Sequence, residues 1–392
     1  MSKILIGVSG GIAAYKALDI VSYFKKQGHD VHVIMTKNAL EFVTPLSFES
    51  LSNNKVHYDT FDKLHYHTTE HISLTENCDL YVIVPATANI IAKVVNGLAD
   101  DMLSTTFLAA NCPKLICPAM NTRMYNNPIT QANLKKALDY NMEILDSESG
   151  ILACGDIGKG RLAHVDKIKE KINYMLKDDD LRNKRVLITL GATCEAIDPV
   201  RFITNHSSGK MGIALAKAYR SHGADVTIIK ANSNIESPLE IKEITAISAS
   251  DMFEEVKENY QDFDIVIMCA AVSDYYLKNI AKNKIKKDSE TLKIELYKTI
   301  DILKYLGQHR LTNQKIIGFA METENLIENA RKKLINKNVD LIVANPLLKE
   351  NAGFKSDNNQ ITIISKDKEE KIPTKSKEEL AYDIIKAIKE LK

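Results

Sequence analysis

The sequence predicts an α/β protein made of two doubly wound, three-layer domains with mostly parallel sheets. Short apolar runs alternate with stretches in which apolar residues recur every 3.6 positions, as expected for strands alternating with helices. This order occurs twice, because residues 27–34 (QGHDVHVI) resemble 222–229 (HGADVTII) and residues 78–85 (CDLYVIVP) resemble 263–270 (FDIVIMCA). Repeated strand-helix-strand units with continuous apolar strands are typical of parallel sheets that helices cover on both faces.

The elements of the first half follow in order. An apolar strand at 4–8 leads into the turn Ser9-Gly10-Gly11. A helix follows, and a β-branched strand begins after Gly28, which predicts the helix stop. The residues expected on the buried face of this helix are Ala14, Ala17, Leu18, Val21 and Phe24.

The second half repeats the pattern with a strand at 186–190, a turn at Gly191 and a helix that stops at Gly223. The buried face of that helix is expected to carry Ile213, Ala214 and Ala218.

The length and the charge distribution support this division. The chain has 392 residues, of which 45% are apolar, enough for two packed cores. Residues 174–185 (YMLKDDDLRNKR) are dense in charge, so we expect a first domain at 1–175, a linker at 176–185 and a second domain at 186–392. Residues 1–180 hold 18 Lys and Arg against 21 Asp and Glu, whereas 181–392 hold 34 against 30.

Composition excludes several classes of protein. The net charge of +1 argues against a general nucleic-acid or membrane-surface binder, both of which usually need a basic excess. The longest apolar runs, such as 265–272, are too short to cross a bilayer, and glycines interrupt the N-terminal run, which we interpret as a buried strand and not a signal peptide. The six cysteines form no CxxC pair, so we expect a reducing, cytoplasmic location.

Ligands of open parallel sheets bind beyond the carboxyl ends of the strands. The segments expected at these ends are residues 9–11, 85–89, 191–193 and 270–274. The Ser9-Gly10-Gly11 turn could admit a phosphate to backbone N–H groups, although a tight strand-to-helix turn explains it equally well. No acidic residue ends the second strand; Thr36 stands there and suits a mononucleotide phosphate better than a dinucleotide ribose. The small and amide side chains of 85–89 leave room for an isoalloxazine ring.

Three further positions in this half could carry chemistry. His71 is either a solvated loop histidine or a base. Asn121 follows the strand at 114–117 and is either a helix N-cap or a strand-end ligand. Cys154 lies in the glycine-rich stretch 150–161, predicted as a mobile loop, where a cysteine is more often chemical than structural.

The first half resembles the flavin-dependent cysteine decarboxylases, in particular phosphopantothenoylcysteine decarboxylase, the flavodoxin-like half of a bifunctional coenzyme A biosynthesis flavoprotein family. The matching motifs occur in order: HISL (71–74), PATAN (85–89), ADD-LSTT (99–106), PAMN-x-x-M (118–124) and ACG-x-x-G-x-GR (153–161). The resemblance implies FMN binding by Gly10, Gly11, Ile12, Thr36, Ala86, Thr87, Asn89, Ser104 and Thr105. It also implies that Asn121 holds the substrate carboxylate with Met124 nearby, and that His71 is a base or orienting residue.

The reaction implied by this resemblance needs a flavin. Loss of CO₂ from a cysteine carboxylate leaves a carbanion with no electron sink, and oxidation of the thiol side to a thioaldehyde-like species supplies one. Decarboxylation then gives an enethiolate. Hydride from the reduced flavin and a proton from Cys154 return it to 4′-phosphopantetheine, under a closed loop that excludes water.

The second half holds a candidate anion site. The stretch 198–212 places Arg201, Asn205 and two serines before a helix, which suits a phosphate; a helix capped by Ser207 or Ser208 accounts for the serines alone. A lysine run (Lys282, Lys284, Lys286 and Lys287) is either a solvated surface or a phosphate contact.

These segments resemble phosphopantothenate–cysteine ligase, a Rossmann-like domain. The matching motifs are DPVR-x-I-x-NHSSGKMG (198–212), CAAV-x-DY (269–275), KIKK (284–287), GF-x-x-ET (318–323) and GF-x-SDNN (353–359). The family reaction activates the phosphopantothenate carboxylate with CTP and Mg²⁺, giving an acyl-cytidylate that cysteine's amine attacks. The resemblance implies that Asn205 and Arg201 hold the acyl group and that Lys284 stabilises charge at the α-phosphate. The implied nucleotide contacts are Met268, Cys269, Ala270, Asp274, Ile300, Asp301, Ile302, Leu303, Phe319, Lys333 and Lys337.

One departure and two alternatives remain. Residues 192–195 (ATCE) differ from the family's usual glycine followed by arginine or glutamine, and the role of Cys194 stays open. A non-catalytic flavoprotein regulatory subunit is the main alternative, although such proteins typically lack one of the positions His71, Asn121 and Cys154. A pyridine-nucleotide oxidoreductase lacks support because the dinucleotide fingerprint is absent. By resemblance we also expect a homo-oligomer, with trimeric decarboxylase and dimeric ligase halves and a dodecamer as the combined form, acting on small molecules.

Overall fold

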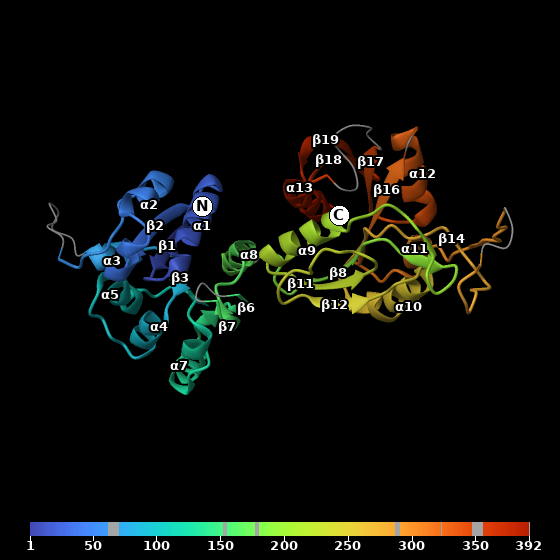
Figure 1. Ribbon diagram of the computed structural model, residues 1–392. Coiled ribbons are helices and arrows are strands. Elements are labelled where there is room, and N and C mark those ends of the chain that lie inside the picture. Colours follow the sequence, from blue (N-terminus) through green and yellow to red (C-terminus); the bar gives the residue numbers. More distant parts are fainter. Residues whose placement is uncertain are drawn as a thin grey trace. The chain divides into compact units, whose positions relative to one another are not determined.

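The computed structural model describes residues 1–61, 70–151, 155–176, 180–286, 291–322, 324–346 and 356–391. Its contacts divide the chain into two compact units, Met1–Leu176 and Lys177–Lys392, each with its own sheet (Figure 1). No helix in the described part of the chain is long and apolar enough to cross a membrane.

The first unit is built on a five-stranded parallel sheet. Its spatial order is β2-β1-β3-β4-β5, the flavodoxin-like order, so the direction of winding reverses between β1 and β3. The strands are β1 (Lys3–Val8), β2 (Asp30–Met35), β3 (Leu80–Ala86), β4 (Lys114–Pro118) and β5 (Glu143–Ile144). A separate antiparallel hairpin joins β6 (Glu148–Ile151) to β7 (Ile157–Arg161).

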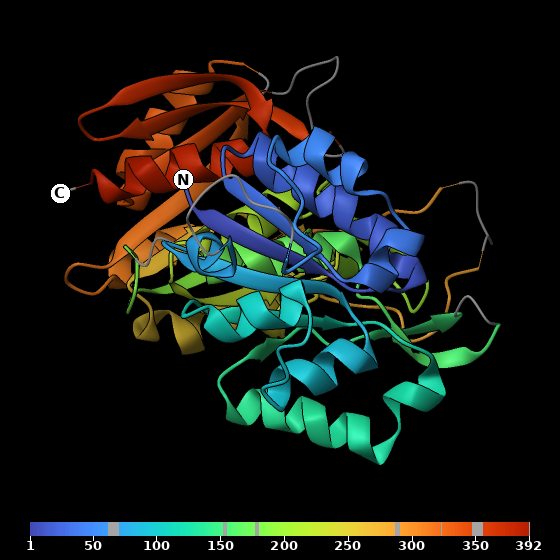
Figure 2. The ribbon, with the colours of Figure 1, turned by 90° about the vertical axis from the view of Figure 1, so that its left-hand side faces the viewer.

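Helices cover both faces of this sheet, which gives three layers, and Figure 2 shows α1 and α4 on opposite sides of it. The alternating residues Ile4, Ile6 and Val8 of β1 pack with α1 and α8, whereas Leu5 packs with α4, α5 and α7. The helical segments are η1 (Ile12–Tyr15), α1 (Lys16–Lys26), η2 (Lys37–Glu41), α2 (Pro45–Ser52), α3 (Glu70–Thr75), α4 (Ala88–Val95), α5 (Met102–Ala109), α6 (Thr122–Tyr125), α7 (Pro128–Asp139) and α8 (Val165–Met175).

The second unit has an eight-stranded sheet in the order β12-β11-β8-β13-β16-β17-β18-β19. The first six are parallel and follow the doubly wound order 3-2-1-4-5-6 of Rossmann folds, and β18 and β19 extend the sheet antiparallel. The strands are β8 (Arg185–Leu190), β11 (Asp225–Lys230), β12 (Lys242–Thr245), β13 (Ile265–Met268), β16 (Lys315–Glu322), β17 (Leu341–Pro346), β18 (Asn358–Ser365) and β19 (Glu369–Ser376).

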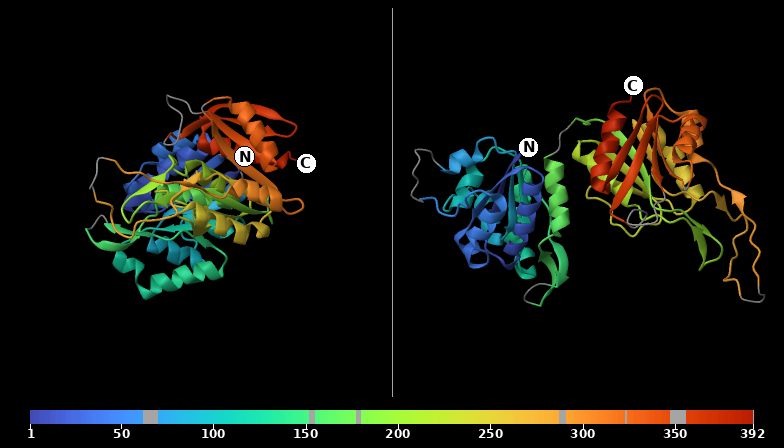
Figure 3. Two further views of the ribbon diagram at one scale, coloured as in Figure 1. Left: turned by 90° about the vertical axis from the view of Figure 1, so that its right-hand side faces the viewer. Right: turned by 90° about the horizontal axis from the view of Figure 1, so that it is seen from above.

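Two cores again lie on opposite faces of the sheet. Val186, Ile188 and Leu190 of β8 face α9 and α13, while Leu187 faces α10, α11 and α12. The helices are α9 (Lys210–Ser221), α10 (Ala249–Asn259), η3 (Tyr260–Asp262), α11 (Ile302–His309), α12 (Leu326–Lys337) and α13 (Lys377–Lys389). Two short hairpins pair β9 (Cys194–Ala196) with β10 (Phe202–Thr204) and β14 (Tyr275–Tyr276) with β15 (Tyr297–Lys298); the latter extends away from the sheet (Figure 3, right).

The predicted fold class is therefore confirmed, as are the first helix of each unit and its glycine stop. Gly28 and Gly223 both have the left-handed backbone, with φ of 84° and 85°, that ends a helix without a Cβ clash. Ala17, Val21 and Phe24 are buried in α1, and Ile213, Ala214 and Ala218 are buried in α9.

Candidate active sites

A cavity of about 1070 Å³ opens beyond the carboxyl ends of the strands of the first unit, at the β1/β3 reversal. Eight of the residues predicted for cofactor or substrate line it: Gly10, Gly11, Ile12, Thr36, Thr87, Asn89, Asn121 and Met124. Sequence reasoning missed other lining residues, including Asn38, Tyr58, Phe61, Lys93 and Asp101. Asn38 and Asp101 lie beside or within predicted segments, but nothing in the sequence shows that their side chains face the cavity. Tyr58 and Phe61 belong to a stretch in which no motif is predicted.

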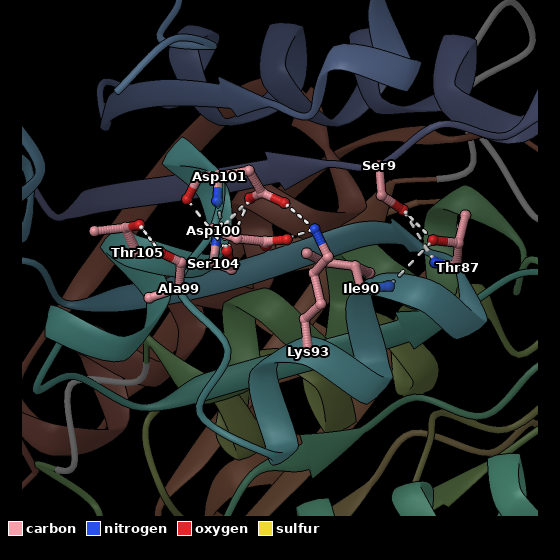
Figure 4. Close-up of polar contacts among 9 residues, drawn as sticks. All are labelled: Ser9, Thr87, Ile90, Lys93, Ala99, Asp100, Asp101, Ser104 and Thr105. Carbon is pink, nitrogen blue, oxygen red and sulfur yellow. Dashed lines mark hydrogen bonds and ion pairs between the residues drawn. The ribbon is translucent and has the colours of Figure 1, made fainter. Parts of the chain in front are cut away.

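Four other predicted positions are placed elsewhere. Ala86 is fully buried in β3, and the Ser104 side chain is engaged in the capping box of α5. The Thr105 hydroxyl donates to the Ala99 carbonyl, 3.2 Å away (Figure 4). His71 lies on the short helix α3, partly buried, and not on the loop that the polar sequence suggested; it does not line the described cavity.

Ser9 holds the ends of β1 and β3 together beside the cavity. Its hydroxyl, 1% exposed, donates to the Pro85 carbonyl at 2.7 Å and accepts from the Thr87 backbone N–H at 3.0 Å. Thr87 then caps α4, because its hydroxyl accepts from the Ile90 N–H at 3.4 Å (Figure 4). These bonds fix the Gly10-Gly11 turn against the start of a helix, where partial positive charge favours an anion.

Gly10 is confined by the neighbouring segment. A Cβ on Gly10 would lie 2.4 Å from the Cβ of Asn38 and 2.7 Å from its backbone carbonyl carbon, so any larger residue displaces the chain. A Cβ on Gly11 would have its nearest atom, Thr87 Cγ2, at 3.7 Å, an ordinary contact. Only the first glycine is required by the packing of this turn.

Thr36 presents a hydroxyl that lacks a partner. Its Oγ1 is buried and makes no hydrogen bond among the described residues, although the residue lines the cavity. A buried hydroxyl without a partner costs about 1–3 kcal/mol, and in native proteins such a group usually meets a water, an ion or a ligand. The donor set of this cavity therefore fits a polar ligand such as a flavin mononucleotide.

A charged group forms another part of the cavity wall. Lys93 Nζ lies 2.6 Å from Asp100 and 2.8 Å from Asp101, and the Asp101 carboxylate accepts from the Ser104 N–H at 2.8 Å (Figure 4). Burial opposes both charges, but the mutual bonds dominate: the pKa of Asp101 is lowered and the pKa of Lys93 is raised. This part of the wall therefore carries one positive and two negative charges, a net charge of −1.

The helix-cap interpretation of Asn121 is confirmed, and its role as a strand-end ligand stays a prediction. It caps α6, where its Oδ1 accepts from the Arg123 N–H at 2.8 Å, and it also lines the cavity. Its Nδ2 donates to Asp156 at 3.1 Å, which orients the amide. A capping residue can therefore also present a fixed amide to a ligand.

The stretch 150–161, expected as a loop, is in part the β6–β7 hairpin, and Cys154 lies outside the described residues. The hairpin approaches the end of β4 closely: Gly160 has a φ of 134°, and a Cβ there would lie 2.3 Å from the Met120 carbonyl oxygen. Asp146 anchors the hairpin base, since it accepts from Lys159 at 2.5 Å and from the Tyr125 hydroxyl. Gly158 and Gly160 thus permit close packing, whereas a Cβ on Gly155 would meet nothing within 4 Å.

In the second unit, a buried carboxylate organises the predicted acyl site. Asp198 is 3% exposed and accepts five bonds: from the Val200 N–H at 2.8 Å, from Arg201 N–H, Nε and Nη2 at 2.9, 2.9 and 2.6 Å, and from the Ile285 N–H at 3.2 Å. Arg201 Nη2 also donates to the Ile285 carbonyl at 2.6 Å. Burial alone would raise the pKa of Asp198, but these donors lower it well below its usual range. The clamp fixes the backbone immediately after Lys284.

Around this clamp the predicted catalytic residues are exposed. Lys284 is exposed, and Lys287 lies outside the described residues. Asn205 Nδ2 donates to the Val272 carbonyl at 3.1 Å, and Asn205, Ser207, Ser208 and Lys210 line a cavity of about 280 Å³. The predicted serine cap of α9 is wrong in position, because the N-cap is Gly209, with a φ of 80°. The Ser207 and Ser208 hydroxyls nevertheless accept from the N–H groups of Gly209 and Lys210, at 3.4 and 3.5 Å.

The predicted nucleotide contacts fall into two groups. Asp301 caps α11 and pairs with Lys337, and Lys333 Nζ donates to the Phe319 carbonyl at 2.9 Å, so α11, α12 and β16 bring these four together. Burial would raise the pKa of Asp301, but Lys337 and the Lys304 N–H lower it. The second group comprises Met268, Cys269, Ala270 and Asp274, at and just after the end of β13, where burial raises the pKa of Cys269 to about 12.

Within the α11 segment Ile300 is 54% exposed, whereas the side chains of Ile302 and Leu303 are buried. These two can therefore offer a ligand little beyond their backbone. The described residues contain no cluster of three or more His, Cys, Asp or Glu side chains arranged for a metal ion.

Comparison with known proteins agrees with this geometry. The model of the "Flavoprotein" family matches residues 1–177, and that of the "DNA/pantothenate metabolism flavoprotein C-terminal domain" matches residues 181–391. The "Coenzyme A biosynthesis bifunctional protein CoaBC" of Bacillus subtilis (strain 168) is 43% identical over 391 residues, which cover 98% of this chain and 96% of that protein. The chain belongs to the CoaBC family.

Other CoaBC proteins show similar identity. That of Borreliella burgdorferi is 42% identical over 98% of both chains. The crystal structure of a CoaBC C-terminal domain is 41% identical, covers 54% of this chain and 96% of its own, and has a TM-score of 0.47. The two family models and the sequence identities confirm the resemblance stated from the motifs, and the first half is that of a flavoprotein.

Proposed function

We propose that the chain catalyses two consecutive steps of coenzyme A biosynthesis. The second unit ligates 4′-phosphopantothenate to cysteine with CTP through an acyl-cytidylate, and the first unit converts the 4′-phosphopantothenoylcysteine product to 4′-phosphopantetheine with FMN. The observation that carries the proposal is the cavity at the β1/β3 reversal, whose buried Thr36 hydroxyl has no partner among the described residues, within a chain that matches CoaBC proteins over its whole length.

In the decarboxylase half, we assign the flavin phosphate to the Ser9-Gly10-Gly11 turn and the start of α4, where Ser9 and Gly10 are held rigidly. FMN supplies reversible two-electron oxidation of the cysteinyl thiol side, which makes loss of CO₂ feasible. The amide of Asn121, oriented by Asp156, is suited to hold the substrate carboxylate. Cys154 and His71 keep the proton-donating and orienting roles that the sequence predicts.

Exposed apolar side chains around this cavity support its sharing between copies of the chain. Ile12, Tyr15 and Phe61 line it and are 64%, 56% and 90% exposed. Exposed apolar side chains gathered around a cavity mark either a ligand-binding groove or an interface with another protein chain. For this half we propose the trimer expected from the resemblance, and for the ligase half a dimer. The two contacts together would give a dodecamer, whose mass can be measured by mass photometry of the holoenzyme. The cytoplasmic location remains a prediction.

In the ligase half, Lys284 is proposed to stabilise charge at the α-phosphate and Asn205 to hold the acyl group. Asp198 and Arg201 act in this proposal by fixing the backbone at Ile285, and Arg201 also adds positive charge for the acyl substrate. The nucleotide is assigned to the α11–α12 group and to the end of β13, with Mg²⁺ on the triphosphate and no protein ligand assigned to it.

The proposal is tested by separating the two activities with one variant. Lys284→Gln should abolish cysteine-dependent CMP release, while FMN-dependent CO₂ release from supplied 4′-phosphopantothenoylcysteine continues. Lys257→Gln, which removes a half-exposed lysine of α10, is the matched control and should preserve both. Loss of both activities in Lys284→Gln would contradict the assignment of two independent sites. Loss of neither activity would contradict the role assigned to Lys284.

A further inference from the structure

Two cysteines meet at the edge of the first sheet that faces away from the cavity. Cys78 precedes β3 and Cys112 precedes β4, and their sulfur atoms are 3.1 Å apart. Both residues are of intermediate exposure and pack against the edge of the core. The sequence separates them by 34 positions and gives no sign of this contact.

The backbone geometry suits a covalent link. β3 and β4 are neighbouring parallel strands in which Tyr81 lies opposite Lys114, and the Tyr81 N–H donates to the Pro113 carbonyl at 3.0 Å. Continued to the cysteines, this register leaves Cys78 one residue out of step with Cys112. A strand spacing of about 4.8 Å and a one-residue offset of about 3.3 Å place Cα atoms roughly 5.8 Å apart, within the roughly 4.4–6.8 Å that disulfides span. The two sulfur atoms need to approach by about 1 Å to reach the bonded distance of about 2.05 Å.

The surroundings make one thiol the nucleophile. The contact with Cys78 lowers the pKa of Cys112, as does the nearby Lys114 ammonium, although burial opposes both effects. The pKa of Cys78 is raised by its hydrogen bond with Cys112 and by burial. A thiolate is therefore favoured on Cys112, beside a protonated partner.

We propose that Cys78 and Cys112 are a modification site that forms a reversible intramolecular disulfide by exchange with a small-molecule disulfide. The Cys112 thiolate attacks one sulfur of the reagent, breaking its S–S bond, and one thiolate leaves. Cys78, losing its proton, then attacks the Cys112 sulfur of the mixed disulfide and releases the second. The two protein thiols are oxidised, and the reagent is reduced to two thiols.

The link joins the amino ends of two strands whose other ends serve the cavity, since Thr87 follows β3 and Ala119 to Asn121 follow β4. The two strands are already paired in this register, so closure leaves the cavity in place. FMN affinity should therefore change less than about twofold on oxidation, while the thermal midpoint rises because the cross-link restricts the unfolded chain.

The test uses the full chain with bound FMN, titrated with mixtures of reduced and oxidised glutathione. Peptide mapping by mass spectrometry should find a Cys78–Cys112 cross-link within one chain, a loss of about 2 Da, reversed by dithiothreitol. Cys112→Ser should instead leave Cys78 reduced or as a glutathione adduct, and Cys194→Ser, the matched control, should retain the cross-link.

Three results overturn the proposal: no cross-link at glutathione ratios that modify other cysteines, a bond from Cys78 or Cys112 to another residue, or a bond between chains. Isotope-coded alkylation of the unmutated chain gives the same readout without any variant, so misfolding of a variant does not obscure the result.

Discussion

Replacing Thr36 with valine should change FMN affinity and the stability of the FMN-free protein in opposite directions. The Thr36 hydroxyl is buried, lines the cavity and has no partner among the described residues. If bound FMN supplies that partner, the variant loses one hydrogen bond in the complex but removes an unsatisfied polar group from the apoprotein.

The magnitudes follow from these two effects. A net hydrogen bond is worth about 0.5–1.5 kcal/mol, so the Kd for FMN should rise roughly 2- to 13-fold. Removing a buried, unpaired hydroxyl should stabilise the apoprotein by about 1–3 kcal/mol, which for a domain of this size raises the thermal midpoint by roughly 2–12 °C.

Fluorescence titration of apoprotein with FMN measures the first effect, and a thermal melt of apoprotein measures the second. Thr36→Ser, which keeps the hydroxyl, should retain the affinity of the unmodified protein. Unchanged FMN affinity in Thr36→Val, or weaker binding together with a less stable apoprotein, would refute this account of the cavity.

Gly10→Ala, whose Cβ would meet Asn38 at 2.4 Å, should destabilise the first unit by about 1–3 kcal/mol in calorimetry and weaken FMN binding in titration. Gly11→Ala should change both quantities little. Equal losses of stability and affinity in the two variants would contradict the packing difference between the two glycines. Asp198→Asn should lower the ligase kcat by roughly 10- to 100-fold, because the backbone beside Lys284 is no longer fixed. Release of CMP measures the ligase rate, and release of CO₂, which should not change, measures decarboxylation. An unaltered ligase rate would contradict the positioning role of Asp198. Burial lowers the pKa of His57 in the folded protein, although Glu70 opposes this effect. His57 therefore binds a proton more readily in the unfolded chain than in the folded protein. The stability that His57 contributes should be complete above pH ~6.5 and lost as the pH falls through its folded pKa, and a histidine NMR titration midpoint above 6.5 contradicts this.

The sequence predicts the fold well because its signals are local. Apolar five- and six-residue runs, helical periodicity and glycine stops each arise within one element, and parallel sheets with two covered faces follow from their alternation. The antiparallel β18 and β19 follow each other without a helix between them, so the strand-helix alternation does not predict them.

The candidate sites are predicted less completely, since contacts between distant segments decide them. Gly10, Thr36 and Asn121 lie at strand ends and were found from that position. Phe61 enters the cavity from a separate segment, and Ser104 looked like a ligand although its hydroxyl serves a helix cap. Asp198 is only the first residue of a motif in the sequence, because its five hydrogen bonds come from Val200, Arg201 and the distant Ile285.

The central claim is that one chain carries out both steps. Purified protein supplied with FMN, Mg²⁺, CTP, cysteine and 4′-phosphopantothenate should release CMP, pyrophosphate and CO₂ in equal amounts and form one 4′-phosphopantetheine for each. Formation of CMP without CO₂, or of neither, in protein that has bound FMN would contradict the account.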